Sequence, residues 1–177
     1  MGQTTPIRSD ELLRQLEHLY HTVQDPSLLL WLQRELEGYD ETDELPWYRI
    51  LECRQRGLFM HPGTAHQHTC QINDKCLCQR DLERVRFLLI RGALHNYLDC
   101  HTATLERWPD ALLREYSQSL IPEHICLYAW KEPIVSIKDH LITGISCVLK
   151  QYVPSMCREM ENPNRSLRSL QHRHWWV

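Results

Sequence analysis

Histidines and cysteines are concentrated in the stretch 61–80, and imidazole and thiolate groups are the ligands of tetrahedral zinc sites. Within each group of candidates, neighbouring ligands are separated by one residue, fewer than in ordinary zinc fingers. Two such ligands could bind one ion only from an extended backbone. Two interpretations stay open, a zinc site as the cofactor of the chain and a loop of unliganded polar residues. The candidate ligands are His66, His68, Cys70, Cys76 and Cys78.

A second group of residues is rich in arginine, whose planar guanidinium group can bind phosphate through two hydrogen bonds. Arg80, Arg84, Arg86 and Arg91 cluster after the histidine and cysteine stretch. If this segment is one helix, Arg80, Arg84 and Arg91 lie on one broad face. This face is either a surface for nucleic acid or a nucleotide, or an ordinary solvated face.

Patterns that would indicate catalysis are weak. The spacing of Arg and His in an all-helical ribonuclease is met only loosely, by Arg14 with His21 and by Arg168 with His174. Ser136 or a loop cysteine could act as a nucleophile beside a histidine, but no glycine turn of the oxyanion type accompanies them. Ser136 is explained equally well as the cap of a helix. We therefore assign no catalytic residue.

The last dozen residues, 166–177, are expected to form a tail that follows a domain over 1–165. Trp175 and Trp176 in this tail belong to a residue type that is enriched at binding hot spots. Binding of the tail to a partner or to its own domain is one interpretation, and fraying is the other.

Length and composition are typical of one globular domain, with 177 residues, 42% hydrophobic and 24% charged. The net charge of -3 excludes a globally basic surface, so any anionic partner must be bound locally. The start of the chain lacks an apolar signal core, and its uncharged runs fall short of the roughly 20 residues of a membrane span. We expect a cytoplasmic chain with reduced cysteines and no membrane partner.

Apolar periodicity and caps predict the helices. Ser9 begins a helix that carries apolar residues to Val23, and Pro26 begins a second helix that ends at Gly38. A short helix follows Trp108, and a longer one runs from Ser136 to Pro154.

The strand pattern is less regular. A hairpin is expected from runs 47–53 and 58–60 around a turn at 54–57, and an irregular loop over 61–80. The run Val85–Ile90 suits a buried strand, although a helix from Asp81 to Leu98 suits the same residues.

The most distinctive stretch extends from Trp31 to Arg49. It contains a Trp, an end of helix with the pattern Glu-Leu-x-Gly-Tyr, a short acidic loop and a Leu-Pro-x-Tyr-Arg strand start. This pattern resembles the AbiTii-type domain, a family linked to abortive-infection defence against bacteriophage. The resemblance extends more weakly over 7–152. Its signature residues are Trp31, Leu36, Gly38, Tyr39, Leu45, Pro46, Tyr48 and Arg49.

Structural roles account for the signature. Gly38 can adopt the left-handed helix end, Pro46 rigidifies the start of a strand, and Trp31 and Tyr39 would pack this corner. Arg49 could pair with a glutamate of the preceding helix, Glu35 or Glu37, or it could bind a phosphate.

Together these features predict an α+β fold, a mostly helical single domain with a small antiparallel sheet. The resemblance implies an interaction or oligomerisation module of a bacterial antiphage system, which acts with a separate effector, a protein partner or further copies of itself. The alternative is a nucleic-acid-binding protein or ribonuclease-like toxin in the same defence context, for which zinc is the candidate stabilising ion.

Overall fold

The computed structural model describes residues 9–64, 66–98 and 105–161, the last nine of these for the backbone alone. The described chain divides into two compact units. The first comprises the described parts of Met1–Arg49, Arg91–Cys100 and Lys138–Val177, and the second those of Ile50–Ile90 and His101–Ile137. Trp175 and Trp176 lie outside the described residues, so the expected division at residue 165 stays a prediction.

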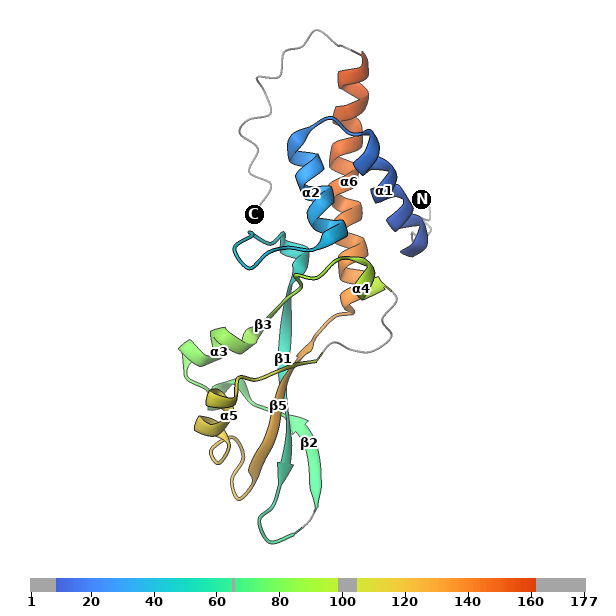
Figure 1. Ribbon diagram of the computed structural model, residues 1–177. Coiled ribbons are helices and arrows are strands. Elements are labelled where there is room, and N and C mark those ends of the chain that lie inside the picture. Colours follow the sequence, from blue (N-terminus) through green and yellow to red (C-terminus); the bar gives the residue numbers. More distant parts are fainter. Residues whose placement is uncertain (1–8, 65, 99–104, 162–177) are drawn as a thin grey trace, which may run out of the picture. The chain divides into compact units, whose positions relative to one another are not determined.

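The first unit is helical. It contains α1 (Ser9–Thr22), α2 (Pro26–Glu37), a 3-10 turn at Trp47–Arg49, the short α4 (His95–Leu98) and α6 (Ile137–Glu161), and the three long helices lie side by side in Figure 1. The Asp25 carboxylate accepts hydrogen bonds from the amides of Ser27 and Leu28 and so caps α2. Leucines from α1, α2 and α6 form the core, among them Leu12, Leu16, Leu28, Leu32 and Leu141.

The second unit is built on an antiparallel sheet (Figure 1). Its strands are β1 (Ile50–Met60), β2 (Gln67–Gln71), β3 (Phe87–Leu89), β4 (Glu106–Arg107) and β5 (Ile125–Pro133). The order is β2-β1-β5-β4, and β3 also pairs with β1. The connections contain a 3-10 turn (Asp74–Cys76), α3 (Gln79–Arg86) and α5 (Asp110–Tyr116).

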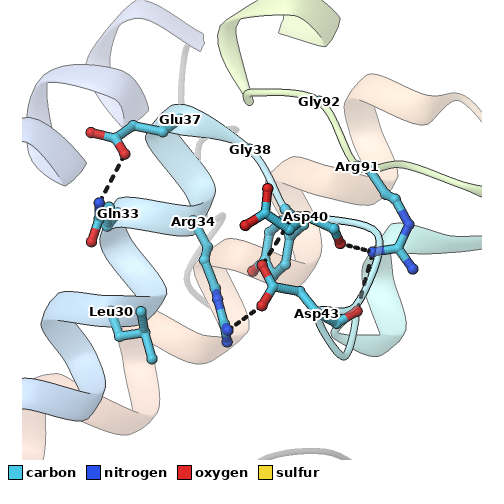
Figure 2. A pocket seen from close by; sticks show the side chains of 10 residues that line it. Leu30, Gln33, Arg34, Glu37, Gly38, Asp40, Asp43, Arg91 and Gly92 are labelled. Atoms are coloured by element: carbon cyan, nitrogen blue, oxygen red, sulfur yellow. Dashed lines mark hydrogen bonds and ion pairs between the residues drawn. The ribbon is translucent and has the colours of Figure 1, made fainter.

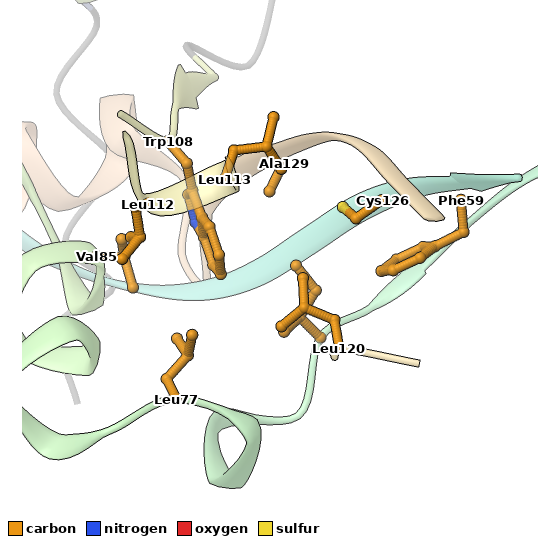
Figure 3. Packing of buried hydrophobic residues seen from close by; sticks show 10 residues of the cluster. Phe59, Leu77, Val85, Trp108, Leu112, Leu113, Leu120, Cys126 and Ala129 are labelled. Carbon is orange, nitrogen blue, oxygen red and sulfur yellow. The ribbon is translucent and has the colours of Figure 1, made fainter. Parts of the chain in front are cut away.

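One face of this sheet packs against α3, α5 and the connecting segments to form the core of the second unit (Figure 3). Gln55 lies within this core, where its side-chain oxygen accepts a hydrogen bond from the indole nitrogen of Trp108 at 2.8 Å. Its side-chain nitrogen donates to the carbonyl of Val85 at 2.8 Å. The cluster consists of Phe59, Ile72, Leu77, Val85, Trp108, Leu112, Leu113, Leu120, Cys126 and Ala129.

The α+β class with a small antiparallel sheet is confirmed, but the predicted hairpin turn at 54–57 is wrong. Residues Ile50–Met60 form one strand, in which buried and more exposed side chains alternate. Arg54 and Arg56 therefore mark the outward positions of a strand rather than a turn. The actual hairpin joins β1 to β2, so the predicted loop over 61–80 contains a strand and the beginning of α3.

The ambiguous segment after Asp81 combines both predictions, because α3 ends at Arg86 and β3 begins at Phe87. The last helix starts where expected, but it continues beyond Pro154 to Glu161. Among the described helices, none combines the length and the hydropathy of a membrane-spanning segment.

Candidate functional site

A pocket of about 550 Å³ lies at the carboxyl end of α2 in the first unit (Figure 2). Residues of α2, the acidic loop that follows it and the segment at 91–92 form its walls. Polar and charged side chains predominate. The lining residues are Leu30, Gln33, Arg34, Glu37, Gly38, Tyr39, Asp40, Asp43, Arg91 and Gly92.

Gly38 positions these walls. Its φ of 109° is one that side chains disfavour, and its amide donates to the carbonyl of Arg34 at 2.9 Å to end the helix. Gly38 also forms a bridge with Gly92, and an added Cβ would lie 3.0 Å from the carbonyl oxygen of Arg91. Glycine is therefore required both by the backbone angle and by the close approach of the second segment.

The charged groups of the pocket are paired with one another. Figure 2 shows Arg34 in an ion pair with Asp43, and Arg91 donating to the backbone carbonyls of Asp40 and Asp43, the latter at 3.1 Å. Arg34 thus holds the acidic loop against α2, and Arg91 holds it against the segment at 91–92. Such a pocket can bind a polar ligand by exchanging these contacts, but its lining offers no nucleophile activated by a neighbouring base.

Directly beside the pocket, Glu35 of α2 is fully buried and is neutralised by the fully buried Arg49. Arg49 Nη2 lies 2.7 Å from Glu35 Oε2, and its Nη1 donates to the carbonyl of Gly92 at 2.7 Å. The guanidinium carbon also lies 4.7 Å from the ring centroid of Tyr39. Of the two predicted roles for Arg49, structural pairing with Glu35 is confirmed and phosphate binding is wrong, because the guanidinium group is enclosed.

Two phenols complete the shell of the buried carboxylate. Tyr39 and Tyr48 donate to Glu35 Oε1 at 2.7 and 2.8 Å, and the indole nitrogen of Trp31 donates to the Tyr48 oxygen at 2.7 Å. Burial, reinforced by the charge of Glu35, raises the pKa of both phenols well above the usual value. These tyrosines therefore remain protonated donors and do not act as general bases.

The signature residues thus gather in the first unit. Leu45 and Pro46 are buried beside the turn that carries Tyr48 and Arg49, whereas Leu36 is half-buried. Its polar members, Trp31, Tyr39, Tyr48 and Arg49, form a connected network with Glu35 in an apolar setting, as expected of residues that hold a fold together.

The predicted zinc ligands all lie in the second unit. His68 and Cys70 are on β2, His66 precedes it, Cys76 ends the 3-10 turn and Cys78 caps α3. Among the described residues, no group of three or more potential ligands is placed to hold a metal ion.

Other contacts engage these thiols. The half-buried Cys70 and Cys76 pack against the hydrophobic cluster, and the Cys78 thiol donates to Asp81 at 3.1 Å. Zinc binding stays a prediction, which metal analysis of protein purified without added zinc can test, with the variant Cys76→Ser, Cys78→Ser as the control.

The structure brings a histidine into this region that the sequence did not indicate. The ring of His124, which precedes β5, lies 5.5 Å from that of His61 and 5.2 Å from that of His68 between centroids. The contact of His124 with His61 and His68 could not be predicted from the sequence, because His124 is far from 61–80 in the chain. It arises because β5 and β2 both flank β1.

The single helix that would carry Arg80, Arg84 and Arg91 on one face is not formed. Arg84 pairs with Asp81 at 3.3 Å and Arg86 with Glu52 at 3.0 Å, whereas Arg80 is exposed on α3. Because α3 ends at Arg86, Arg91 does not lie on that helix and instead lines the pocket of the first unit.

A different arginine-bearing surface lies on the outward face of the sheet, opposite the core. Arg56 of β1 and Arg107 of β4 flank Trp130 of β5 at directly paired positions. Tyr128 lies on the same face, and the guanidinium carbon of Arg107 is 5.0 Å from its ring centroid. We call Arg56, Arg107, Tyr128 and Trp130 the aromatic-arginine platform.

Exposed apolar side chains gather nearer the start of β1. Ile50 is paired with Leu89 of β3, Phe87 is paired with Glu52, and the Ile134 amide donates to the Glu52 carbonyl at 3.1 Å. All four apolar side chains are exposed. We call Ile50, Phe87, Leu89 and Ile134 the apolar cluster.

The fold and the network beside the pocket define an α+β protein in which no buried side-chain polar atom of the described residues lacks a hydrogen-bond partner. A family model described as AbiTii matches residues 4–139, and the chain belongs to the AbiTii family. This family places the chain in the context of abortive-infection defence against phage. No curated protein and no solved structure matches it.

Proposed function

We propose that this chain is an interaction module of a cytoplasmic antiphage system, which acts by self-association and by contact with a separate effector. The apolar cluster is the observation that carries this proposal. Contiguous exposed apolar groups cost free energy in water, and in soluble proteins they mark surfaces that bind other proteins.

The surroundings of the cluster suit a protein interface. The guanidinium carbon of Arg86 lies 5.3 Å from the Phe87 ring centroid, and Arg86 pairs with Glu52 between the apolar side chains. Aromatic residues and arginine are enriched in interfaces, and an ion pair at the rim adds specificity more than affinity. In a dimer, the apolar cluster of one copy would contact the apolar cluster of the other, which is the arrangement of a twofold interface.

The ionisable groups of the first unit support a binding function over catalysis. Glu35, Tyr39 and Tyr48 are the groups whose burial would suit them to acid or base chemistry, but each is used in a hydrogen bond inside the protein. A catalytic group must reach a substrate, and these groups are enclosed.

The test is the molar mass of the full chain in solution over a micromolar concentration series, measured by light scattering and sedimentation. Leu89→Ser removes an exposed side chain of the cluster, and Leu29→Ser is the control because Leu29 is an exposed leucine of α2 that does not line the pocket. We expect wild type and the control to associate and Leu89→Ser to shift towards monomer. A wild-type chain that stays monomeric at the highest concentration, or equal behaviour of the two variants, would contradict the proposal.

A second measurement connects the surface to defence. Plaque formation is counted on bacteria that carry the chain with its neighbouring genes. Leu89→Ser is expected to lower protection and Leu29→Ser to leave it unchanged. Equal protection by both variants would show that the apolar cluster is not needed.

A further inference from the structure

We propose that the aromatic-arginine platform on the second unit binds single-stranded nucleic acid. This inference goes beyond the proposed interaction module, because it concerns a different ligand and a different part of the sheet. It also differs from the arginine face expected from the sequence, none of whose residues belongs to the platform.

The platform is a continuous row across the sheet. From β2 to β4 the paired residues are Gln71, Arg56, Trp130 and Arg107, so Trp130 lies between two arginines. In antiparallel sheets such directly paired side chains lie side by side on one face. The row thus combines a stacking surface with cations on both sides of it.

Tyr128 provides a second stacking surface. It lies two residues before Trp130 on the same strand, which separates the two rings by about 7 Å along β5. Tyr128 is half exposed and Trp130 is half-buried, so both side chains are partly accessible to a ligand from solvent. Aromatic rings spaced along a strand can stack successive bases of an unpaired nucleic acid, because every base has a flat apolar face.

The local charge favours a polyanion. Arg54 and Arg56 share one carboxylate, that of Glu132, at 2.9 and 3.6 Å, which leaves an excess of positive charge on this face. The excess is local, because the whole chain carries a net charge of -3. Such a positive patch attracts phosphate groups even where the protein as a whole is acidic.

The second cation of the platform is also available to a ligand. Arg107 pairs with Asp110 at 3.2 Å, but both side chains are more than half exposed. Exposed pairs of this kind are weak, so a phosphate can replace the carboxylate. The stacking of Arg107 on Tyr128 would then orient the guanidinium group beside a bound base.

Uncharged polar groups border the row on β2. Gln71 is paired with Arg56, and Thr69 is paired with Leu58 next to Tyr128. Amide and hydroxyl groups can bind either phosphate or base edges. A protein partner would instead prefer an apolar centre, which lies at the separate apolar cluster around β3.

Fluorescence anisotropy with labelled single-stranded RNA and DNA homopolymers tests the proposal on the full chain. We expect binding that weakens as salt rises, with a slope of about -0.7 per phosphate contact in a log-log plot. A duplex of the same length should bind less tightly, because its bases are not free to stack.

Two variants of the platform have matched controls. Tyr128→Ala should weaken binding about tenfold or more, whereas Tyr128→Phe, which keeps the ring, should bind as wild type does. Arg107→Ala should weaken binding and lower the salt slope by about one contact, whereas Arg114→Ala, at an exposed arginine of α5, should change neither. Circular dichroism checks that each variant is folded.

Several results would overturn the inference. They are no binding by wild type at low salt, equal losses for Arg107→Ala and Arg114→Ala, or a preference for duplex. If Tyr128→Ala disrupts self-association and wild type binds no nucleic acid, the platform is a protein interface and the inference is wrong. The proposed role of the apolar cluster in self-association is tested separately, by the molar mass of the Leu89→Ser variant.

Discussion

Substitution of Glu35 by glutamine tests the central role of the buried network. The neutral amide keeps the shape of the side chain but removes the charge that balances the enclosed Arg49 guanidinium. It also presents an N–H group where a carboxylate oxygen accepted bonds. Removing one partner of a buried ion pair costs about 3–5 kcal/mol. Against a total free energy of unfolding of about 5–15 kcal/mol, such a loss removes between roughly a fifth and the whole of the stability.

The free energy of unfolding is measured by urea denaturation followed by circular dichroism. Glu37→Gln is the control, because Glu37 is exposed on the same helix and should change stability by less than about 0.5 kcal/mol. Arg49→Met removes the other partner, and the double variant should lose less stability than the sum of the two single losses, because neither charge is then left alone. A loss below about 1 kcal/mol for Glu35→Gln, or strict additivity, would refute the account of the network.

Three further outcomes follow from individual contacts. Gly144→Ala should lower stability by about 1–3 kcal/mol in thermal denaturation, despite the better helix propensity of alanine, because its Cβ would lie 2.2 Å from Cβ of Tyr48. Burial raises the pKa of Cys53 to about 11 from 9.0, so mass spectrometry should detect alkylation of the exposed Cys147 before that of Cys53. Because only the unfolded Cys53 thiol ionises between pH 9 and 11, its contribution to stability should fall as pH rises through that window. Gln55→Leu should cost about 1–3 kcal/mol in urea, since it leaves a buried indole N–H without its acceptor.

Local signals predicted the first unit well. The Asp25 cap, the proline after it and Gly38 are residues whose own backbone preferences and nearby hydrogen bonds determine where α2 begins and ends. Arg49 could be paired with Glu35 or Glu37 in advance, because both glutamates lie in the predicted α2, shortly before Arg49 in the chain. These features depend on residues close together in the chain.

The second unit depends on contacts between distant residues, and there the predictions failed. The composition of the segment 54–57 is typical of a turn. Pairing with β5, which is distant in the sequence, instead makes this segment the middle of a long strand. The aromatic-arginine platform was missed for the same reason, since Arg107 and Trp130 meet Arg56 only through strand pairing. In the pocket, Arg91 reaches the acidic loop through the Gly38–Gly92 bridge, for which neither segment carries a signal.

The first unit is interrupted twice in the sequence, by the segments Ile50–Ile90 and His101–Ile137. As the ribosome delivers the chain, α1 and α2 emerge long before α6, which supplies the ring that stacks on Trp31 and the close contact at Tyr48. The amino-terminal helices α1 and α2 therefore lack their contacts with α6 until most of the chain has been synthesised. A messenger truncated before α6 would therefore yield a first unit that cannot complete its own interior.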